Sequence, residues 1–199
     1  MIRKSPYDVA LLDLRMPGMD GLTLYREIKK LRAATVAIIV TAYASSTTAD
    51  EALSAGAWQI VPKPVDLPGL LRLVEQALGQ PLVMVVDDDH DLCENLWDLL
   101  RERGYRVCVA HDEAETSRLI KDRSFKVVLI DMKLRHDDGQ RVFDLVRRLN
   151  PEARTILITG FRGETERAVE RLVAEGADAV CYKPFDMPNL LDTLKRLTG

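Results

Sequence analysis

The chain has only three cysteines, an odd number with no CxxC pair, so neither a disulfide framework nor a zinc ribbon is expected. Cys108 and Cys181 lie in apolar runs, which predicts buried, reduced thiols. The three histidines share no ligand spacing with the cysteines, and this argues against a structural zinc site. These features are typical of a reducing compartment, and we expect the protein to be cytoplasmic.

Long apolar runs are also missing, since none approaches the ~20 residues needed to cross a bilayer, and no signal-peptide pattern is present. With 28 Lys and Arg against 31 Asp and Glu, the chain lacks the clustered basic surface of a nucleic-acid-binding domain. We therefore expect neither a membrane nor a nucleic acid as a partner. The 199 residues, 47% hydrophobic and 30% charged, suit one large globular domain or two small ones.

What the sequence does contain is a set of short apolar runs, each followed by a functional polar group. The runs and their polar ends are Leu82–Val86 before Asp87 and Asp88, Lys126–Ile130 before Asp131, Thr155–Ile158 before Thr159, and Ala179–Tyr182 before Lys183. Runs of this kind suit parallel strands that are covered on both faces. In an open α/β sheet, ligands bind outside the carboxyl ends of the strands, so these polar groups should converge on one site.

The second half of the chain reads as five β–α units. The predicted strands are near 82–86, 105–110, 126–130, 154–158 and 179–182, and the predicted helices near 90–103, 112–123, 139–149, 163–175 and 187–198. Gly104 fits the position just after a helix end, and Asn150-Pro151 stops another helix. The pattern predicts an α/β fold with a doubly wound, flavodoxin-like, five-stranded parallel sheet in the order 2-1-3-4-5.

The chain also repeats itself at a long, nearly constant spacing, which indicates tandem domains. The matched pairs are Asp13 with Asp131, Gly21 with Gly139, Thr41 with Thr159, Gly56 with Gly176, and Lys63-Pro64 with Lys183-Pro184. The first copy starts opposite the end of the second helix of the other copy, so it has three β–α units. We predict a copy truncated at its N-terminus over 1–79 and a complete domain over 80–199.

The truncation has a structural consequence for the first copy. In the strand order given above, Val9–Leu12 loses the strand that should lie beside it. It would then be an apolar edge strand with unpaired backbone groups, a feature that invites pairing with another chain. Two interpretations stay open: a remnant of a truncated domain, and a natural half-domain whose edge another chain completes.

The polar set in the second copy suits phosphoryl chemistry at Asp131. A carboxylate that accepts a phosphoryl group gathers negative charge, and a divalent cation is needed to neutralise it. Mg²⁺ binds through one or two carboxylates plus phosphoryl oxygen, and Asp87 and Asp88 could supply those ligands. Lys183 could pair with one phosphoryl oxygen, and Thr159 could donate its hydroxyl to another. For Asp89, capping of the following helix is the better interpretation.

Together these residues resemble the receiver domains of two-component response regulators. The resemblance implies Mg²⁺- or Mn²⁺-dependent transfer of phosphate from the phosphohistidine of a histidine kinase or histidine phosphotransfer protein. It implies no conventional enzyme, only self-phosphorylation and self-dephosphorylation, and it leaves a homo-oligomer open. The implied roles are phosphoacceptor for Asp131; metal ligands for Asp87, Asp88, Asp131 and the backbone carbonyl of Lys133; and phosphoryl-binding switch for Thr159 and Lys183.

The two copies depart from the family pattern in different ways. In the first copy, Asp13, Thr41 and Lys63 form a degenerate set, because the acidic pair is absent with the missing strand. Asp13 should therefore phosphorylate poorly or not at all. In the second copy, Arg135 stands where the first copy has the usual loop proline, Pro17.

Two other enzyme and cofactor classes fit poorly, and one rival remains. A haloacid-dehalogenase-like phosphatase would place its nucleophile first, in a DxD pair, and a dinucleotide-binding module would need GxGxxG after its first strand. Here the acidic pair Asp87-Asp88 comes first and Asp131-Met132-Lys133 lacks the second acid. The rival is a non-phosphorylated, receiver-like scaffold or dimerisation module.

Overall fold

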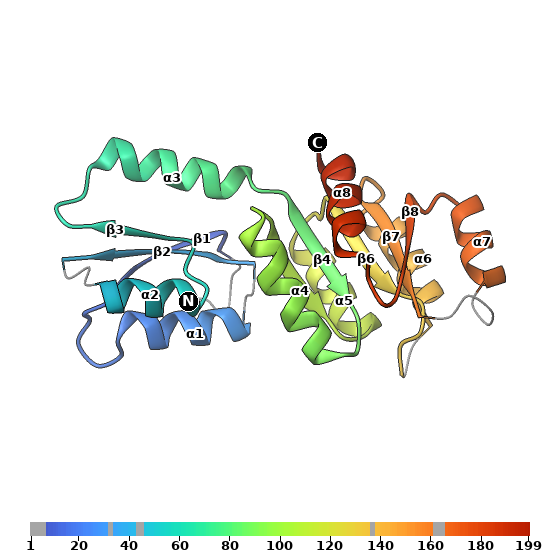
Figure 1. The fold of residues 1–199 in the computed structure, drawn as a ribbon, viewed down its shortest axis with the longest axis horizontal. Helices are drawn as coiled ribbons and strands as arrows, with labels where there is room; N and C mark the ends of the chain where they lie inside the picture. The colour runs from blue at the N-terminus through green and yellow to red at the C-terminus, as the bar shows by residue number, and fades with distance from the viewer. Residues whose placement is uncertain (1–6, 32–33, 43–45, 136–137, 161–165) are drawn as a thin grey trace. The chain divides into compact units, whose positions relative to one another are not determined.

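The computed structural model describes residues 7–31, 34–42, 46–135, 138–160 and 166–199. The chain divides into two compact units, Met1–Gln80 and Pro81–Gly199, called here the first and the second unit. Each is an α/β unit built on its own parallel sheet (Figure 1).

The second unit contains a five-stranded sheet in which every strand pairing is parallel. Its strands are β4 (Leu82–Val86), β5 (Arg106–Ala110), β6 (Val127–Asp131), β7 (Arg154–Thr159) and β8 (Ala179–Tyr182). Their spatial order is β5-β4-β6-β7-β8, which is the order 2-1-3-4-5 expected from the sequence. The predicted fold class is confirmed. β4 and β6 lie side by side in the interior of the sheet, and their carboxyl ends meet at one edge.

Five helices flank this sheet: α4 (His90–Glu102), α5 (Glu113–Asp122), α6 (Gly139–Leu149), α7 (Glu166–Ala174) and α8 (Met187–Thr198). An aspartate caps the N-terminus of four of them, and the predicted cap is confirmed: Asp89 accepts a hydrogen bond from the Leu92 N–H at 3.0 Å. Gly104 follows α4 at a φ of 86°, which glycine adopts readily. No helix in the described part of the chain has both the length and the apolarity to cross a bilayer.

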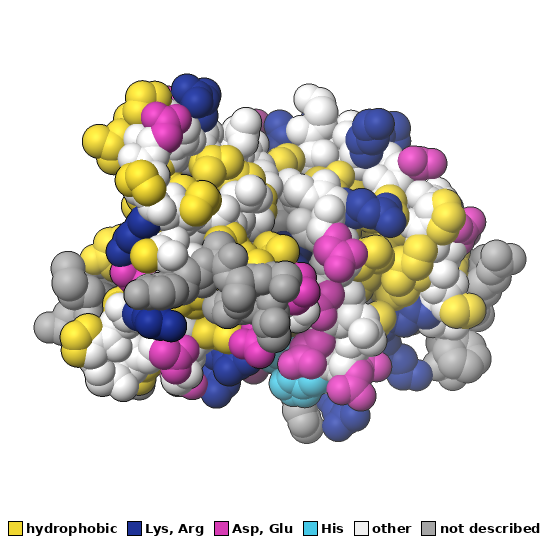
Figure 2. Space-filling view, turned by 60° about the vertical axis from the view of Figure 1, so that its left-hand side comes forward, with side chains coloured by type: hydrophobic (Ala, Val, Ile, Leu, Met, Phe, Trp, Pro, Cys, Tyr) yellow, Lys and Arg dark blue, Asp and Glu magenta, His cyan; other side chains and the backbone are white. Residues whose placement is uncertain are grey.

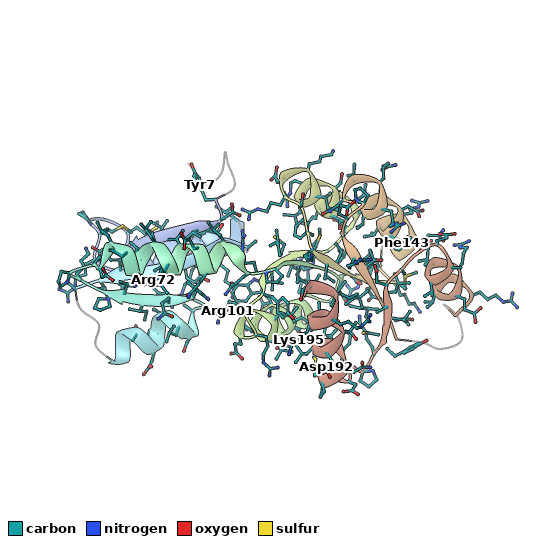
Figure 3. The ribbon with its side chains drawn as sticks, turned by 90° about the horizontal axis from the view of Figure 1, so that it is seen from above. Tyr7, Arg72, Arg101, Phe143, Asp192 and Lys195 are labelled. Atoms are coloured by element: carbon teal, nitrogen blue, oxygen red, sulfur yellow. The ribbon has the colours of Figure 1, made fainter. Side chains whose placement is uncertain are left out.

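The core of the second unit explains why its strands read as uninterrupted apolar runs. The side chains of Val83–Val86 and Val127–Ile130 are fully buried, because helices cover both faces of the sheet (Figure 1). Phe143 of α6 is also buried and extends from its helix among the side chains of this unit (Figure 3). This packing fixes the strand ends that carry the polar groups.

The described residues of the first unit form three strands and three helices. They are β1 (Val9–Asp13), α1 (Gly21–Leu31), β2 (Val36–Thr41), α2 (Ser46–Ser54), β3 (Gln59–Pro62) and α3 (Leu67–Gly79). The sheet order is β1-β2-β3, and among the described residues β1 pairs only with β2. Val9–Leu12 therefore lies in an edge strand, as expected, and the Leu11 side chain is 50% exposed.

The apolar surface of the first unit is unusually open. Leu67, Leu71 and Leu78 of α3 are exposed (Figure 2 shows exposed hydrophobic side chains on the surface). Leu70 and Val74 of α3 are partly buried, whereas Leu190 and Leu194, at the equivalent positions of α8, are buried. The second unit has two strands, β4 and β5, without counterparts among the described strands of the first unit, and the shorter sheet leaves α3 less covered.

Gly139→Ala should lower the free energy of unfolding of the second unit by about 2 kcal/mol or more, because an added Cβ would clash with the backbone. That Cβ would lie 2.4 Å from the Asp131 carbonyl oxygen. Urea unfolding followed by Trp97 fluorescence, in a Trp58→Phe background, measures the change. Gly160→Ala is the control and should be nearly neutral, since its Cβ would meet nothing closer than 4.0 Å. Equal losses in the two variants would contradict the steric explanation.

Candidate metal and phosphoryl site

Three carboxylates converge where β4 and β6 end. Asp87 and Asp88 follow β4, and Asp131 is the last residue of β6. One oxygen from each can be chosen so that all three lie within 4.8 Å of one another. Asp87 and Asp131 are buried, and Asp88 is partly exposed. The sheet register brings them together, because Val86 is directly opposite Ile130.

Lys183 ties two of these carboxylates together. Its Nζ atom donates to Oδ2 of Asp87 and to Oδ2 of Asp131, at 2.7 Å in each case. The lysine is held in place by its own backbone, whose N–H donates to the Thr159 carbonyl oxygen at 2.8 Å. One ammonium group therefore joins the ends of two central strands.

The remaining oxygens of the buried pair accept backbone hydrogen bonds. The Asp89 N–H donates to Oδ1 of Asp87 at 2.9 Å, and the Lys133 N–H donates to Oδ1 of Asp131 at 3.0 Å. Both carboxylates thus have one oxygen fixed by the main chain and one by Lys183. Such contacts hold both carboxylates in a defined orientation.

Burial and charge shift the protonation of the pair in defined directions. Burial raises the pKa of Asp87, and the nearby Asp131 charge adds to this, against the lowering effect of Lys183 and of the backbone. For Lys183, burial lowers the pKa, but hydrogen bonds to Asp131 and Asp87 outweigh it, and its pKa lies above the usual range. The lysine is therefore cationic at neutral pH.

Asp88 has a partner of its own. Arg135, from the loop after β6, places its Nε atom 3.0 Å from Oδ2 of Asp88. The arginine side chain is 80% exposed, compared with 21% for the aspartate. From the sequence, Arg135 was notable only because it replaces the usual loop proline. In the structure it contacts Asp88, a candidate metal ligand.

Thr159 and Lys133 lie at the same edge of the sheet. Thr159 ends β7, is buried, and is opposite Tyr182 in the register, one residue before Lys183. Lys133 forms an isolated bridge with Asp138, which closes the loop after β6.

His111 is a neighbour of the site that the sequence did not reveal. Its Nδ1 atom lies 2.9 Å from the Asp87 carbonyl oxygen, and its ring is 3.9 Å from that of His90, centroid to centroid. Both histidines line a cavity of about 930 Å³ together with Asp88, Asp91 and Arg135. His111 could have been found from its position directly after β5, because ligands bind outside the carboxyl ends of all the parallel strands.

The first unit repeats part of this geometry. Lys63 forms an ion pair with Asp13 at 2.5 Å, and the Arg15 N–H donates to the other oxygen of Asp13 at 3.0 Å. The hydrogen bond from Lys63 is the main cause of a lowered Asp13 pKa. Thr41 is buried at the end of β2, where its carbonyl oxygen accepts the Lys63 N–H at 2.9 Å. In the described part of this unit, no group of three acidic, histidine or cysteine ligands gathers around Asp13.

Comparison with known proteins agrees with this geometry. The response regulator receiver domain matches residues 1–75 and 83–195. The chain therefore belongs to the response regulator receiver domain family, whose members are not conventional enzymes.

Individual relatives support the same assignment. A response regulator receiver protein of Anaeromyxobacter sp. (strain Fw109-5) is 32% identical over 200 residues, covering 99% of this chain and 79% of the relative. The transcriptional regulatory protein ZraR of Salmonella typhimurium is 43% identical over 118 residues, 59% of this chain. The match spans only 26% of ZraR, so it concerns one part of that protein.

Solved structures resemble one receiver-sized part of the chain. A CheY-like receiver domain protein from Methanospirillum hungatei JF-1 aligns with a TM-score of 0.54 and 30% identity, covering 59% of this chain and 93% of that one. A response regulator from Burkholderia pseudomallei, with a phosphorylated aspartic acid and a calcium ion, aligns with a TM-score of 0.53 and 28% identity. That alignment covers 58% of this chain and 66% of the other.

The donor set of the second unit suits a hard divalent cation. All three side-chain donors are carboxylates, and oxygen is the ligand that Mg²⁺ prefers. The cluster includes two buried carboxylates close together, which repel each other unless positive charge lies between or beside them. The acidic cluster is thus typical of the divalent-cation site of a receiver.

Lys183→Ala should cost the second unit about 2 kcal/mol of unfolding free energy at neutral pH, because Asp87 and Asp131 would repel each other without their shared cation. The deficit should shrink on acidification, and should begin to do so above the ordinary carboxyl range, because burial raises the pKa of Asp87 and a protonated Asp87 no longer repels Asp131. In the wild type, the raised Lys183 pKa means that its contribution is full at neutral pH and is lost only in strong alkali.

Urea unfolding across a pH series, with Trp97 as the probe in a Trp58→Phe background, tests this. Lys63→Ala is the matched control in the first unit, measured through Trp58 in a Trp97→Phe background. Its loss should be smaller, because Lys63 pairs with a single, more exposed aspartate. A Lys183→Ala deficit that stayed constant from pH 3 to pH 8 would contradict the repulsion argument.

Proposed function

We propose that residues 80–199 form a phosphoacceptor receiver that takes a phosphoryl group onto Asp131 from a phosphohistidine. The observation that carries this proposal is the fixed Asp131 carboxylate, which contacts Lys183 and lies in a cluster with Asp87 and Asp88. The donor would be a histidine kinase or a histidine phosphotransfer protein. Phosphorylation would then switch a surface that binds a partner.

Asp87, Asp88, Asp131 and the backbone carbonyl of Lys133 would hold Mg²⁺ or Mn²⁺. When bound, the cation would neutralise the carboxylates and the incoming phosphoryl oxygens. The carboxylates are already oriented by the backbone and by Lys183, which lowers the entropy cost of gathering them.

The transfer itself needs positioning more than covalent chemistry. A carboxylate oxygen of Asp131 attacks phosphorus, and a new O–P bond forms as the P–N bond to the donor imidazole breaks. The imidazole nitrogen keeps the electron pair of the broken bond. Lys183, which donates to two carboxylates, would then also pair with a phosphoryl oxygen. The Thr159 hydroxyl would donate to another phosphoryl oxygen.

For residues 1–79 we propose a partial receiver copy, with Asp13, Thr41 and Lys63 as a degenerate site. The ion pair of Lys63 with Asp13 reproduces one contact of the complete site. Among the described residues of this unit β1 pairs only with β2, so no strand beside β1 supplies an acidic pair. Asp13 would therefore accept phosphate poorly.

A second candidate function, a scaffold or dimerisation module, applies to the first unit. Two observations favour it: the unpaired edge of β1 and the exposed leucines of α3. An unpaired, apolar edge strand is a template for pairing with another chain. This role would be compatible with phosphorylation in the second unit.

Incubation with acetyl phosphate and Mg²⁺ should add one phosphoryl group to the wild-type chain, detected by intact-mass spectrometry. The adduct should be missing in Asp131→Ala and in samples without Mg²⁺, and it should persist in Asp13→Ala. Asp13→Ala is the matched control, because it removes the equivalent carboxylate of the other copy.

No adduct in any sample, together with no effect of beryllofluoride and Mg²⁺ on the chain, would contradict the phosphoacceptor proposal and leave the scaffold. An adduct lost in Asp13→Ala instead would assign the activity to the first unit.

Asp87→Asn should abolish the stabilisation of the second unit by Mg²⁺. For the wild type, Mg²⁺ at tenfold its Kd should add about 1.4 kcal/mol to the unfolding free energy, because it binds only the folded site. Thermal unfolding with Mg²⁺ or with EDTA measures the difference. A variant that retained the full Mg²⁺ effect would remove Asp87 from the ligand set.

A further inference from the structure

The three site carboxylates are matched by two cations from the chain itself. Lys183 serves Asp87 and Asp131, and Arg135 serves Asp88. The two cations differ in how firmly they are held: Lys183 is 25% exposed and makes two contacts of 2.7 Å, whereas Arg135 is 80% exposed and its contact is 3.0 Å. Arg135 is therefore the cation that leaves its carboxylate more easily.

Arg135 and a divalent cation need the same group. Asp88 belongs to the carboxylate cluster, and its Oδ2 atom is the one that Arg135 contacts. A cation bound to Asp88 would also lie close to the guanidinium and be repelled by it. The loop position of Arg135, four residues after Asp131, keeps the guanidinium within reach of the site.

We propose that Arg135 is an internal counter-ion that occupies Asp88 when no metal is bound and thereby sets the Mg²⁺ concentration at which the receiver loads. This inference rests on the proposed function and adds to it a residue that regulates metal affinity. Before loading, Arg135 offsets the charge of Asp88; on loading, Mg²⁺ takes its place and the arginine swings to solvent.

The chain contains a natural comparison for this role. In the first copy, Pro17 stands at the position of Arg135, and that copy has no acidic pair to neutralise. The position equivalent to Arg135 therefore carries no cation in the copy that has no acidic pair. The size of the effect is bounded, because an exposed ion pair changes an equilibrium constant by less than about fivefold.

The experiment is an NMR titration of the full chain with MgCl₂ at constant ionic strength, following backbone amides that shift on binding. Arg135→Gln should bind Mg²⁺ about two- to fivefold more tightly than the wild type at low salt. Arg135→Lys, which keeps the charge, should restore an affinity close to that of the wild type. The gain in Arg135→Gln should shrink at high salt, because salt screens exposed charges.

Arg154→Gln is the matched control. Arg154 is also an exposed arginine, paired with the partly buried Asp178 at 3.0 Å, but it begins β7 and so lies at the opposite end of the strands from the site. Its removal changes the net charge equally and should leave the Mg²⁺ affinity unchanged. Equal tightening in both variants would mean a general charge effect and would overturn the role of Arg135.

The remaining outcomes separate the two proposals. Mg²⁺ binding with the same Kd in the wild type and Arg135→Gln would overturn the counter-ion role and leave the receiver function intact. No Mg²⁺ binding in any variant would overturn the metal site of the proposed function, and the counter-ion role with it.

Discussion

The contact on which the site depends is the bridge from Lys183 to Asp87 and Asp131. Lys183 follows β8 at the far edge of the sheet, yet its side chain reaches the ends of β6 and β4 in the interior. The loop after β8 must therefore lean back across the end of β7, where the Thr159 carbonyl oxygen holds the lysine backbone. A single ammonium group offsets the mutual repulsion of two buried carboxylates.

Much of this arrangement could be predicted, because strand ends are a property of the backbone. Apolar runs fix which residues end each strand, and the parallel topology fixes that those ends share an edge, so the meeting of Asp87, Asp131 and Lys183 followed. The pairing of Arg135 with Asp88 could not be predicted, since it depends on the path of an exposed loop and on one rotamer. Tyr105 shows a smaller limit: it was placed at the start of a strand, but β5 begins at Arg106, and the Tyr105 N–H donates to the Leu100 carbonyl oxygen in the turn after α4.

The two units show how neighbours change the same contact. Lysine meets aspartate in both, but in the first unit the side chains of Lys63 and Asp13 are 43% and 32% exposed, whereas Asp131 in the second is buried. The difference comes from β4, the strand beside β6, and from the helices that cover the sheet. Solvent screens the exposed pair, so its electrostatic contribution is weaker. Burial, rather than the lysine–aspartate pair alone, gives the second unit its charged and rigid site.

The strand order has one more consequence for the second unit. Because β4 and β5 both lie on one side of β6, the domain consists of two contiguous halves that meet along the β4–β6 seam. The carboxylate cluster lies across that seam, with Asp87 and Asp88 from one half and Asp131 from the other. The site is thus built from residues of both halves of this domain. A cation held by all three carboxylates would therefore need both halves of the domain in place, so binding at this site would require the complete fold.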